Sequence, residues 1–166
     1  PAEGRVRQDV TIEIKGDRIT DVRRQKPLPE NADVVDLGDA TCMPGLFELH
    51  AHLLADGTFL QRPYGVSNSE AALIQLRQAQ RAMKDGFTTI RSTAEWGEYA
   101  LVDVRNHIKQ GHYKGPRIYV APHNLSPTGG HGDINNYPPD AALRLTGENV
   151  LAGTDNIRER VREEVK

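Results

Sequence analysis

The sequence predicts an α/β fold in which parallel strands alternate with helices. Three observations support this prediction. Runs rich in apolar and β-branched residues occur at 44–53, 87–92 and 117–121. The segments between these runs carry apolar residues at helical intervals, and a glycine follows the expected end of each segment. A strand–helix–strand order places neighbouring strands in parallel, because the connecting helix returns the chain to the same edge of the sheet.

The first elements are expected to form a hairpin. Val6–Ile14 contains alternating apolar residues, Lys15–Arg18 has the composition of a turn, and Ile19–Val22 is the expected return strand. A stretch with two prolines follows, and Val34–Leu37 is predicted to form another short strand.

The run that begins at Pro44 and Gly45 carries two histidines, His50 and His52. It is too short for a helix, and a turn precedes it, so a strand is favoured. Strand side chains two residues apart point to the same face, so the two imidazoles should lie close enough to bind one metal ion. A pair of structural histidines, one of them capping a loop, is the alternative.

Helices are predicted after this strand and after the next two. The first has the capping-box spacing of Ser67 and Glu70 and stops at Gly86. The second is expected over Tyr99–Gln110, and Thr154 is the expected cap of the third. The apolar faces comprise, in order, Leu73, Leu76, Ala79 and Met83; Leu101, Val104 and Ile108; and Ile157, Val161 and Val165.

Composition excludes several functional classes. A net charge of −2 with 27% charged residues gives no basic surface for nucleic acid. No apolar run is long enough to span a membrane. The single cysteine, Cys42, cannot form an internal disulfide. We expect a soluble protein, either cytoplasmic or exported after removal of a signal peptide.

Several motifs together are similar to the start of the amidohydrolase superfamily. They are Asp9-Val10-x-Ile12, Gly16-Asp17-Arg18-Ile19, Met43-Pro44-Gly45-Leu46 and His50-x-His52. Further motifs resemble the branch of imidazolonepropionase-like enzymes and Xaa-Pro dipeptidases. These are Gly86-Phe87-Thr88-Thr89-Ile90-Arg91, Gly115-Pro116-Arg117-Ile118 and Leu125-Ser126-Pro127-Thr128-Gly129-Gly130-His131-Gly132-Asp133.

The resemblance implies a (β/α)8 barrel preceded by a small β-sandwich. We expect residues 1–43 to supply strands of the sandwich and residues 44–166 to supply the first βα units of the barrel. Since such barrels need about 200 residues or more, the barrel is expected to be incomplete in this chain of 166 residues. The chain is therefore interpreted as the N-terminal part of a larger enzyme.

The resemblance also implies hydrolysis of an amide or peptide bond by a metal-activated hydroxide. The expected substrate is an Xaa-Pro dipeptide or an N-acyl amino acid, and the expected cofactors are two divalent metal ions, zinc by default. His50 and His52 would bind metal. A bridging carboxylated lysine and a proton-shuttling aspartate are expected beyond residue 166, so no catalytic residue is assigned within the chain. A homo-oligomer is expected.

Three residues are candidates for substrate binding. His131 lies between glycines, which let a ligand approach the backbone closely, although a simple turn residue would fit the same pattern. Tyr64 and Arg91 lie near expected strand ends, and a structural ion pair would explain Arg91 equally well. His123 either approaches the site or hydrogen-bonds within its loop. His107 and His112 are predicted to be surface residues.

The sequence also fits two other functions. The first is a mononuclear cyclic amidohydrolase or a deaminase. The second is a non-catalytic barrel remnant that acts as a binding module.

Overall fold

A computed structural model of the chain shows two compact units, residues 1–44 and residues 45–166. The structure describes residues 4, 6–24, 27–28, 30–55, 66–95, 97–133, 138 and 150–165.

The first unit contains an antiparallel hairpin of β1 (Val10–Lys15) and β2 (Arg18–Arg24), as the sequence predicts. The first strand begins later than expected, because Val6 is 80% exposed and precedes the pairing. Asp9 has a φ of 52°, a left-handed conformation that interrupts the extended chain just before β1.

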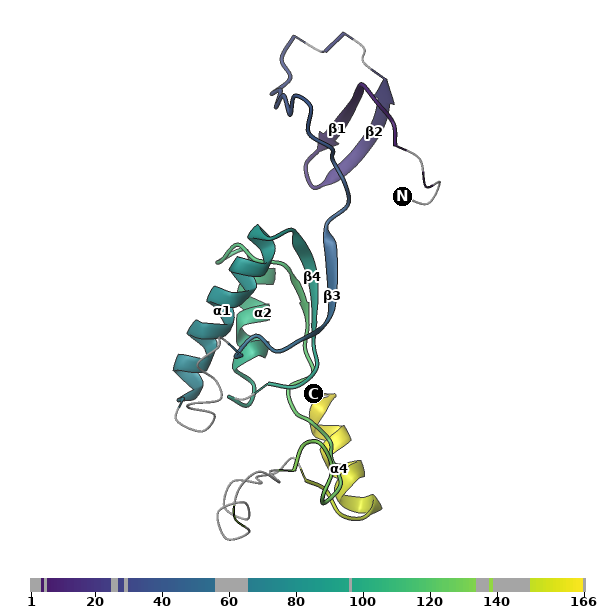
Figure 1. The fold of residues 1–166 in the computed structure, drawn as a ribbon. Helices are drawn as coiled ribbons and strands as arrows, with labels where there is room; N and C mark the ends of the chain where they lie inside the picture. The colour runs from purple at the N-terminus through teal and green to yellow at the C-terminus, as the bar shows by residue number, and fades with distance from the viewer. Residues whose placement is uncertain are drawn as a thin grey trace. The chain divides into compact units, whose positions relative to one another are not determined.

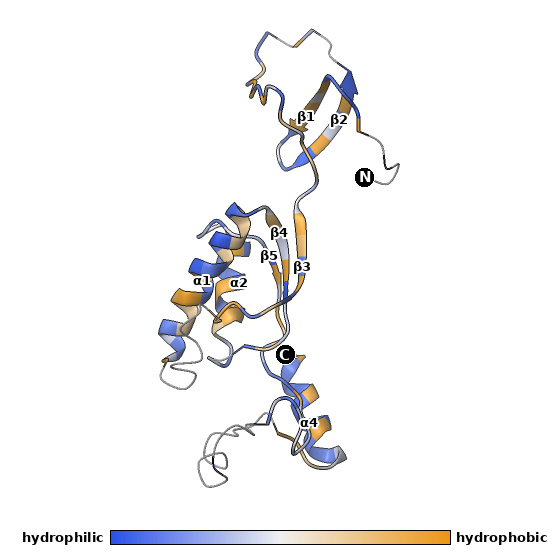
Figure 2. Ribbon diagram, in the orientation of Figure 1, coloured by the Kyte–Doolittle hydropathy of each residue, from blue (hydrophilic) through white to orange (hydrophobic). Residues whose placement is uncertain are grey.

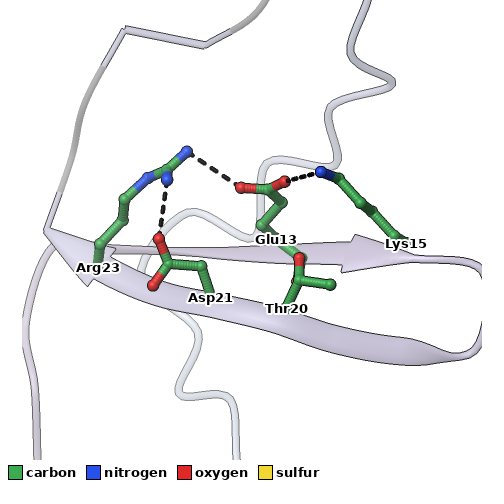
Figure 3. A network of polar contacts seen from close by, with 5 residues as sticks. All are labelled: Glu13, Lys15, Thr20, Asp21 and Arg23. Atoms are coloured by element: carbon green, nitrogen blue, oxygen red, sulfur yellow. Dashed lines mark hydrogen bonds and ion pairs between the residues drawn. The ribbon is translucent and has the colours of Figure 1, made fainter.

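Charged side chains form a network on one face of this hairpin (Figure 3). Glu13 forms ion pairs with Lys15, at 3.3 Å, and with Arg23, at 3.2 Å. Arg23 also reaches Asp21 at 2.8 Å. Such surface pairs contribute only about 0–1 kcal/mol each, so their main effect is to keep this face of the hairpin polar.

The strand predicted over 34–37 is wrong. In the described part of this segment the chain has no strand pairing, and Val34, Val35 and Leu37 are 58%, 81% and 56% exposed. The segment instead ends in a turn, in which Gly38 N donates to Asp36 Oδ1 at 2.8 Å. Its β-branched residues favour an extended chain, but a strand also needs a partner.

The second unit confirms the α/β prediction. A parallel sheet has the order β3 (Leu46–Ala51), β4 (Phe87–Ser92) and β5 (Arg117–Tyr119). Helices α1 (Asn68–Lys84) and α2 (Ala100–Lys109) follow β3 and β4 respectively. Figure 1 shows both helices on the same side of the sheet.

The hydrophobic core lies between these helices and the sheet. Ile90 and Ile118 are register partners on β4 and β5, and they pack with Ala79 of α1 and with Leu101 and Val104 of α2. The neighbouring positions on these strands point to the opposite face of the sheet. Tyr119 of β5 lies on that face, and so does Phe47 of β3, whose register partner Thr89 precedes Ile90. Their side chains are 58% and 63% exposed. Figure 2 shows hydrophobic residues along β3.

Local signals place the ends of α1 correctly. Ser67 is the N-cap, and its Oγ accepts from Glu70 N at 3.2 Å. Gly86, just past the end, has a φ of 97°, which favours glycine. The predicted apolar face is wrong in part, since Leu73 is 69% exposed. The buried stripe of the helix consists of Ala71, Gln75 and Ala79.

Helix α4 (Thr154–Glu164) begins one residue after its N-cap, Gly153, so Thr154 is not the cap. Its predicted apolar face is also wrong. Ile157, Val161 and Val165 are exposed, whereas Arg160 is buried. Near its end, Glu164 Oε1 lies 2.6 Å from Nδ1 of His123, so this histidine hydrogen-bonds to α4, outside its own loop. Across the described ranges, no helix is both long and apolar enough to cross a bilayer.

Candidate functional site

The two predicted metal ligands lie together at the C-terminal end of β3. His50 is the penultimate residue of the strand, and His52 follows its last residue. Their ring centroids are 5.3 Å apart, and the rings meet edge to face at 74°. The pairing with β4 shifts register between Glu48 and Ala51, so simple alternation of side chains does not hold here. The two rings are adjacent nonetheless.

A backbone carbonyl fixes the orientation of the His52 ring. Nδ1 of His52 lies 2.9 Å from the carbonyl oxygen of Ala94, in the loop after β4. A carbonyl oxygen can only accept, so Nδ1 must carry the proton. In the neutral ring the lone pair is then on Nε2. This is the tautomer in which a histidine binds metal through Nε2 while its other nitrogen donates to an acceptor.

A buried carboxylate, Glu95, lies next to this carbonyl and was not identified from the sequence. It accepts hydrogen bonds from Leu53 N at 2.7 Å, from Leu54 N at 3.1 Å and from Ser92 Oγ at 2.9 Å. Burial raises the pKa of the Glu95 carboxyl above its ordinary value, while the hydrogen bonds it accepts and the nearby His52 oppose this rise. The signal available in the sequence was an acid just past a strand, at the sheet edge where His52 lies.

Arg91 is joined to the histidine strand, and Tyr64 lies outside the described residues. The Nε of Arg91 donates to the carbonyl oxygen of Leu49 at 2.8 Å. The contact that the structure gives for Arg91 is therefore to a backbone carbonyl next to His50, and its side chain is exposed.

His131 lies in a closed glycine-rich turn. Gly129 N donates to Asp133 Oδ2 at 2.8 Å, and Gly132 N donates to Ser126 Oγ at 2.9 Å. These two bonds stabilise the turn on either side of His131, whose side chain is exposed and takes part in neither bond. Within the described ranges, no contact joins His131 to His50 or His52.

The residues present fit part of a metal site. Two neutral imidazoles suit zinc and neighbouring divalent ions, and the His52 tautomer is the one required. Among the described residues, however, no group of three or more His, Cys, Asp or Glu side chains could hold an ion. His107 and His112 form another imidazole pair, with 3.0 Å between their Nδ1 atoms, and both are exposed, as predicted.

Comparison with known proteins gives one group of relatives, although no family model matches the chain. The ochratoxinase of Aspergillus niger is 31% identical over 108 residues, which are 63% of this chain. A solved amidohydrolase is 31% identical over 95% of this chain, with a TM-score of 0.74. A Xaa-Pro dipeptidase, solved with methionine bound in its active site, is 27% identical over 94% of this chain, with a TM-score of 0.76.

The chain spans only part of each relative. It matches 22% of the ochratoxinase, 40% of the amidohydrolase and 39% of the dipeptidase. The likeness to the two solved structures therefore covers nearly all of this chain, but each of the three matches covers less than half of the relative.

Proposed function

From its place in the amidohydrolase superfamily, we propose that this chain forms part of a metal-dependent hydrolase that cleaves amide bonds. The observation that carries the proposal is the imidazole pair at the end of β3. Its ring centroids are 5.3 Å apart, and the Nδ1 of His52 is engaged by a carbonyl oxygen. In a parallel α/β barrel, catalytic residues come from this end of the strands.

The fold supports a barrel as the setting of this pair. Both helices that connect the sheet strands cover one face, as the outer helices of a barrel do. The other face carries exposed Phe47 and Tyr119, which would face a barrel interior. We assign residues 44–166 to βα units of the barrel and residues 1–43 to strands of a β-sandwich.

His50 and His52 would hold a divalent ion, zinc by default, as part of a centre of two ions. When bound, such an ion lowers the pKa of water to about 7 and polarises a carbonyl group as a Lewis acid. The role of the chain is to present two imidazole nitrogens in a fixed orientation. The Ala94 carbonyl does this for His52 by holding the proton on Nδ1.

The proposed substrate carries a free carboxylate next to the scissile amide, as an Xaa-Pro dipeptide or an N-acyl amino acid does. Arg91, exposed beside the histidine strand, offers a guanidinium group, which pairs well with carboxylates. His131 would contact the substrate from its glycine-rich turn. The similarity to a Xaa-Pro dipeptidase supports the dipeptide member of this class.

A substrate panel on the intact protein tests this proposal. Xaa-Pro dipeptides, N-acyl amino acids and cyclic amides would be assayed before and after metal removal by a chelator, and again after zinc is restored. We expect hydrolysis of the first two classes, loss on chelation and recovery with zinc. Turnover of cyclic amides alone would contradict the substrate class, and no metal-dependent turnover at all would contradict the hydrolase.

Replacing His131 with alanine should weaken substrate binding more than it slows the chemical step. His131 is exposed in a turn held by other residues, so the substitution leaves the turn intact. Loss of one hydrogen bond to a charged group costs about 1.5–3 kcal/mol, so kcat/KM should fall roughly 10- to 150-fold, mostly through KM. His112→Ala is the matched control. Unchanged steady-state kinetics in His131→Ala would exclude His131 from the substrate site.

A further inference from the structure

The loop after β3 and the loop after β4 are joined by a set of hydrogen bonds that converge near His52. Leu53 N and Leu54 N both donate to the Glu95 carboxylate, and Nδ1 of His52 donates to the Ala94 carbonyl oxygen. The residues that immediately follow His52 are thus bound to the residue that immediately follows Ala94. Glu95 is 6% exposed, so these bonds lie in a largely dry setting.

We propose that Glu95 is a positioning residue that holds the His52 ring in its metal-binding orientation. This inference rests on the proposed function, in which His52 is a metal ligand. Glu95 acts on both hydrogen-bonding partners. Its carboxylate fixes the backbone just after His52, and its own backbone fixes the position of the Ala94 carbonyl that accepts from the His52 ring.

The backbone of Ala94 shows why such an anchor is needed. Ala94 has a φ of 118°, which a residue with a Cβ rarely adopts. A strained conformation of this kind costs about 1–3 kcal/mol and persists only where neighbouring contacts enforce it. Glu95 N donates to the carbonyl oxygen of Pro122 at 3.2 Å, and its carboxylate binds the loop after β3. Glu95 is therefore held on two sides, and the strained Ala94 carbonyl is held with it.

A carboxylate suits this position better than an amide or a hydroxyl. Oε1 accepts from Leu53 N and Ser92 Oγ, and Oε2 accepts from Leu54 N. All three donors need acceptors, and a glutamine has only one acceptor oxygen. In Glu95→Gln the amide NH2 group would face at least one N–H donor, so the loop that carries His52 would have to move.

A role limited to fold stability is the competing explanation. It predicts that loss of Glu95 lowers the free energy of unfolding but leaves the His52 tautomer and the metal affinity of the folded protein unchanged. A positioning role predicts that both properties change in protein that remains folded.

The test compares Glu95→Gln with Glu98→Gln in the intact protein. Glu98 is an exposed carboxylate three residues away that accepts from Asn68 Nδ2 at 2.9 Å, so its substitution is chemically matched. Zinc affinity would be measured by competition with a chromogenic chelator, and the His52 tautomer by ¹⁵N chemical shifts of the metal-free protein. We expect zinc affinity to fall about 10- to 100-fold in Glu95→Gln and to stay unchanged in Glu98→Gln.

The tautomer measurement separates failure of this inference from failure of the proposed function. If the native protein binds no zinc at this pair, the proposed function fails, but loss of the Nδ1-protonated signal in Glu95→Gln still supports positioning. Native affinity and an unchanged tautomer in folded Glu95→Gln would overturn the inference. If Glu95→Gln does not fold, Glu95→Asp serves instead, because it keeps the charge but withdraws the oxygens from Leu53 and Leu54. A native tautomer and zinc affinity in Glu95→Asp would equally overturn it.

Discussion

Replacing His50 and His52 together with alanine is expected to remove the bound metal and nearly abolish amide hydrolysis. The pair supplies the imidazoles that the structure brings together at the end of β3, with centroids 5.3 Å apart. A catalytic metal contributes several kcal/mol of transition-state stabilisation, so the rate should fall roughly a thousandfold or more. Elemental analysis and a hydrolysis assay on the same preparations measure both effects.

The chain offers a matched control for this experiment. His107 and His112 form a second imidazole pair, exposed near the end of α2, with Nδ1 atoms 3.0 Å apart. We expect their double alanine variant to keep native activity and to lose at most weakly bound metal. Full metal content and activity in the His50→Ala/His52→Ala protein would refute the assignment of this pair.

The substitution Gly45→Ala is expected to destabilise the second unit strongly. A Cβ atom at Gly45 would lie 2.1 Å from Oγ1, 2.2 Å from Cγ2 and 2.6 Å from Cβ of Thr88. Because even the Cβ of Thr88 is too close, a change of side-chain rotamer cannot relieve the overlap, and the backbone before β3 must move away from β4. Such overpacking costs about 1–3 kcal/mol and occasionally more. Chemical denaturation of the two proteins measures the difference.

A double-mutant cycle with Thr88→Gly identifies the cause. Removing the Thr88 side chain opens the space that the new Cβ needs, so Gly45→Ala should cost much less in the Thr88→Gly background than in the native one. Equal costs in both backgrounds would show that the contact with Thr88 is not the reason that glycine is needed.

Elements governed by local signals could be predicted from the sequence. The strand over Phe87–Ser92 is observed with the expected bounds, and Ser67 caps α1 as its spacing with Glu70 indicates. Capping, a β-rich run and a terminal glycine all act within a few residues. The proximity of His50 and His52 was predictable for the same reason, since they are only two positions apart in the chain.

The failures arise where distant residues decide the outcome. Val34–Leu37 has the composition of a strand but is exposed, because strand formation depends on a partner that composition does not reveal. The buried side of α4 includes Arg160 rather than the apolar residues, and the contact of Glu164 with His123 joins positions 41 residues apart. Glu95 was missed for this reason too, since Leu53 and Leu54, whose backbone N–H groups bind it, precede it by 42 and 41 residues.

The hydrogen bonds around His52 also determine when the site can form during folding. The bonds from Arg91 to Leu49, from His52 to Ala94 and from Leu53 to Glu95 each close a loop of 42 residues. Closing such a loop costs entropy that only the completed β3–α1–β4 packing can offset. His50 and His52 precede Glu95 in the chain, so they are synthesised before it. We therefore expect the native setting of the histidine pair to form late in folding, and a metal ion that bound it would stabilise a completed unit instead of nucleating one.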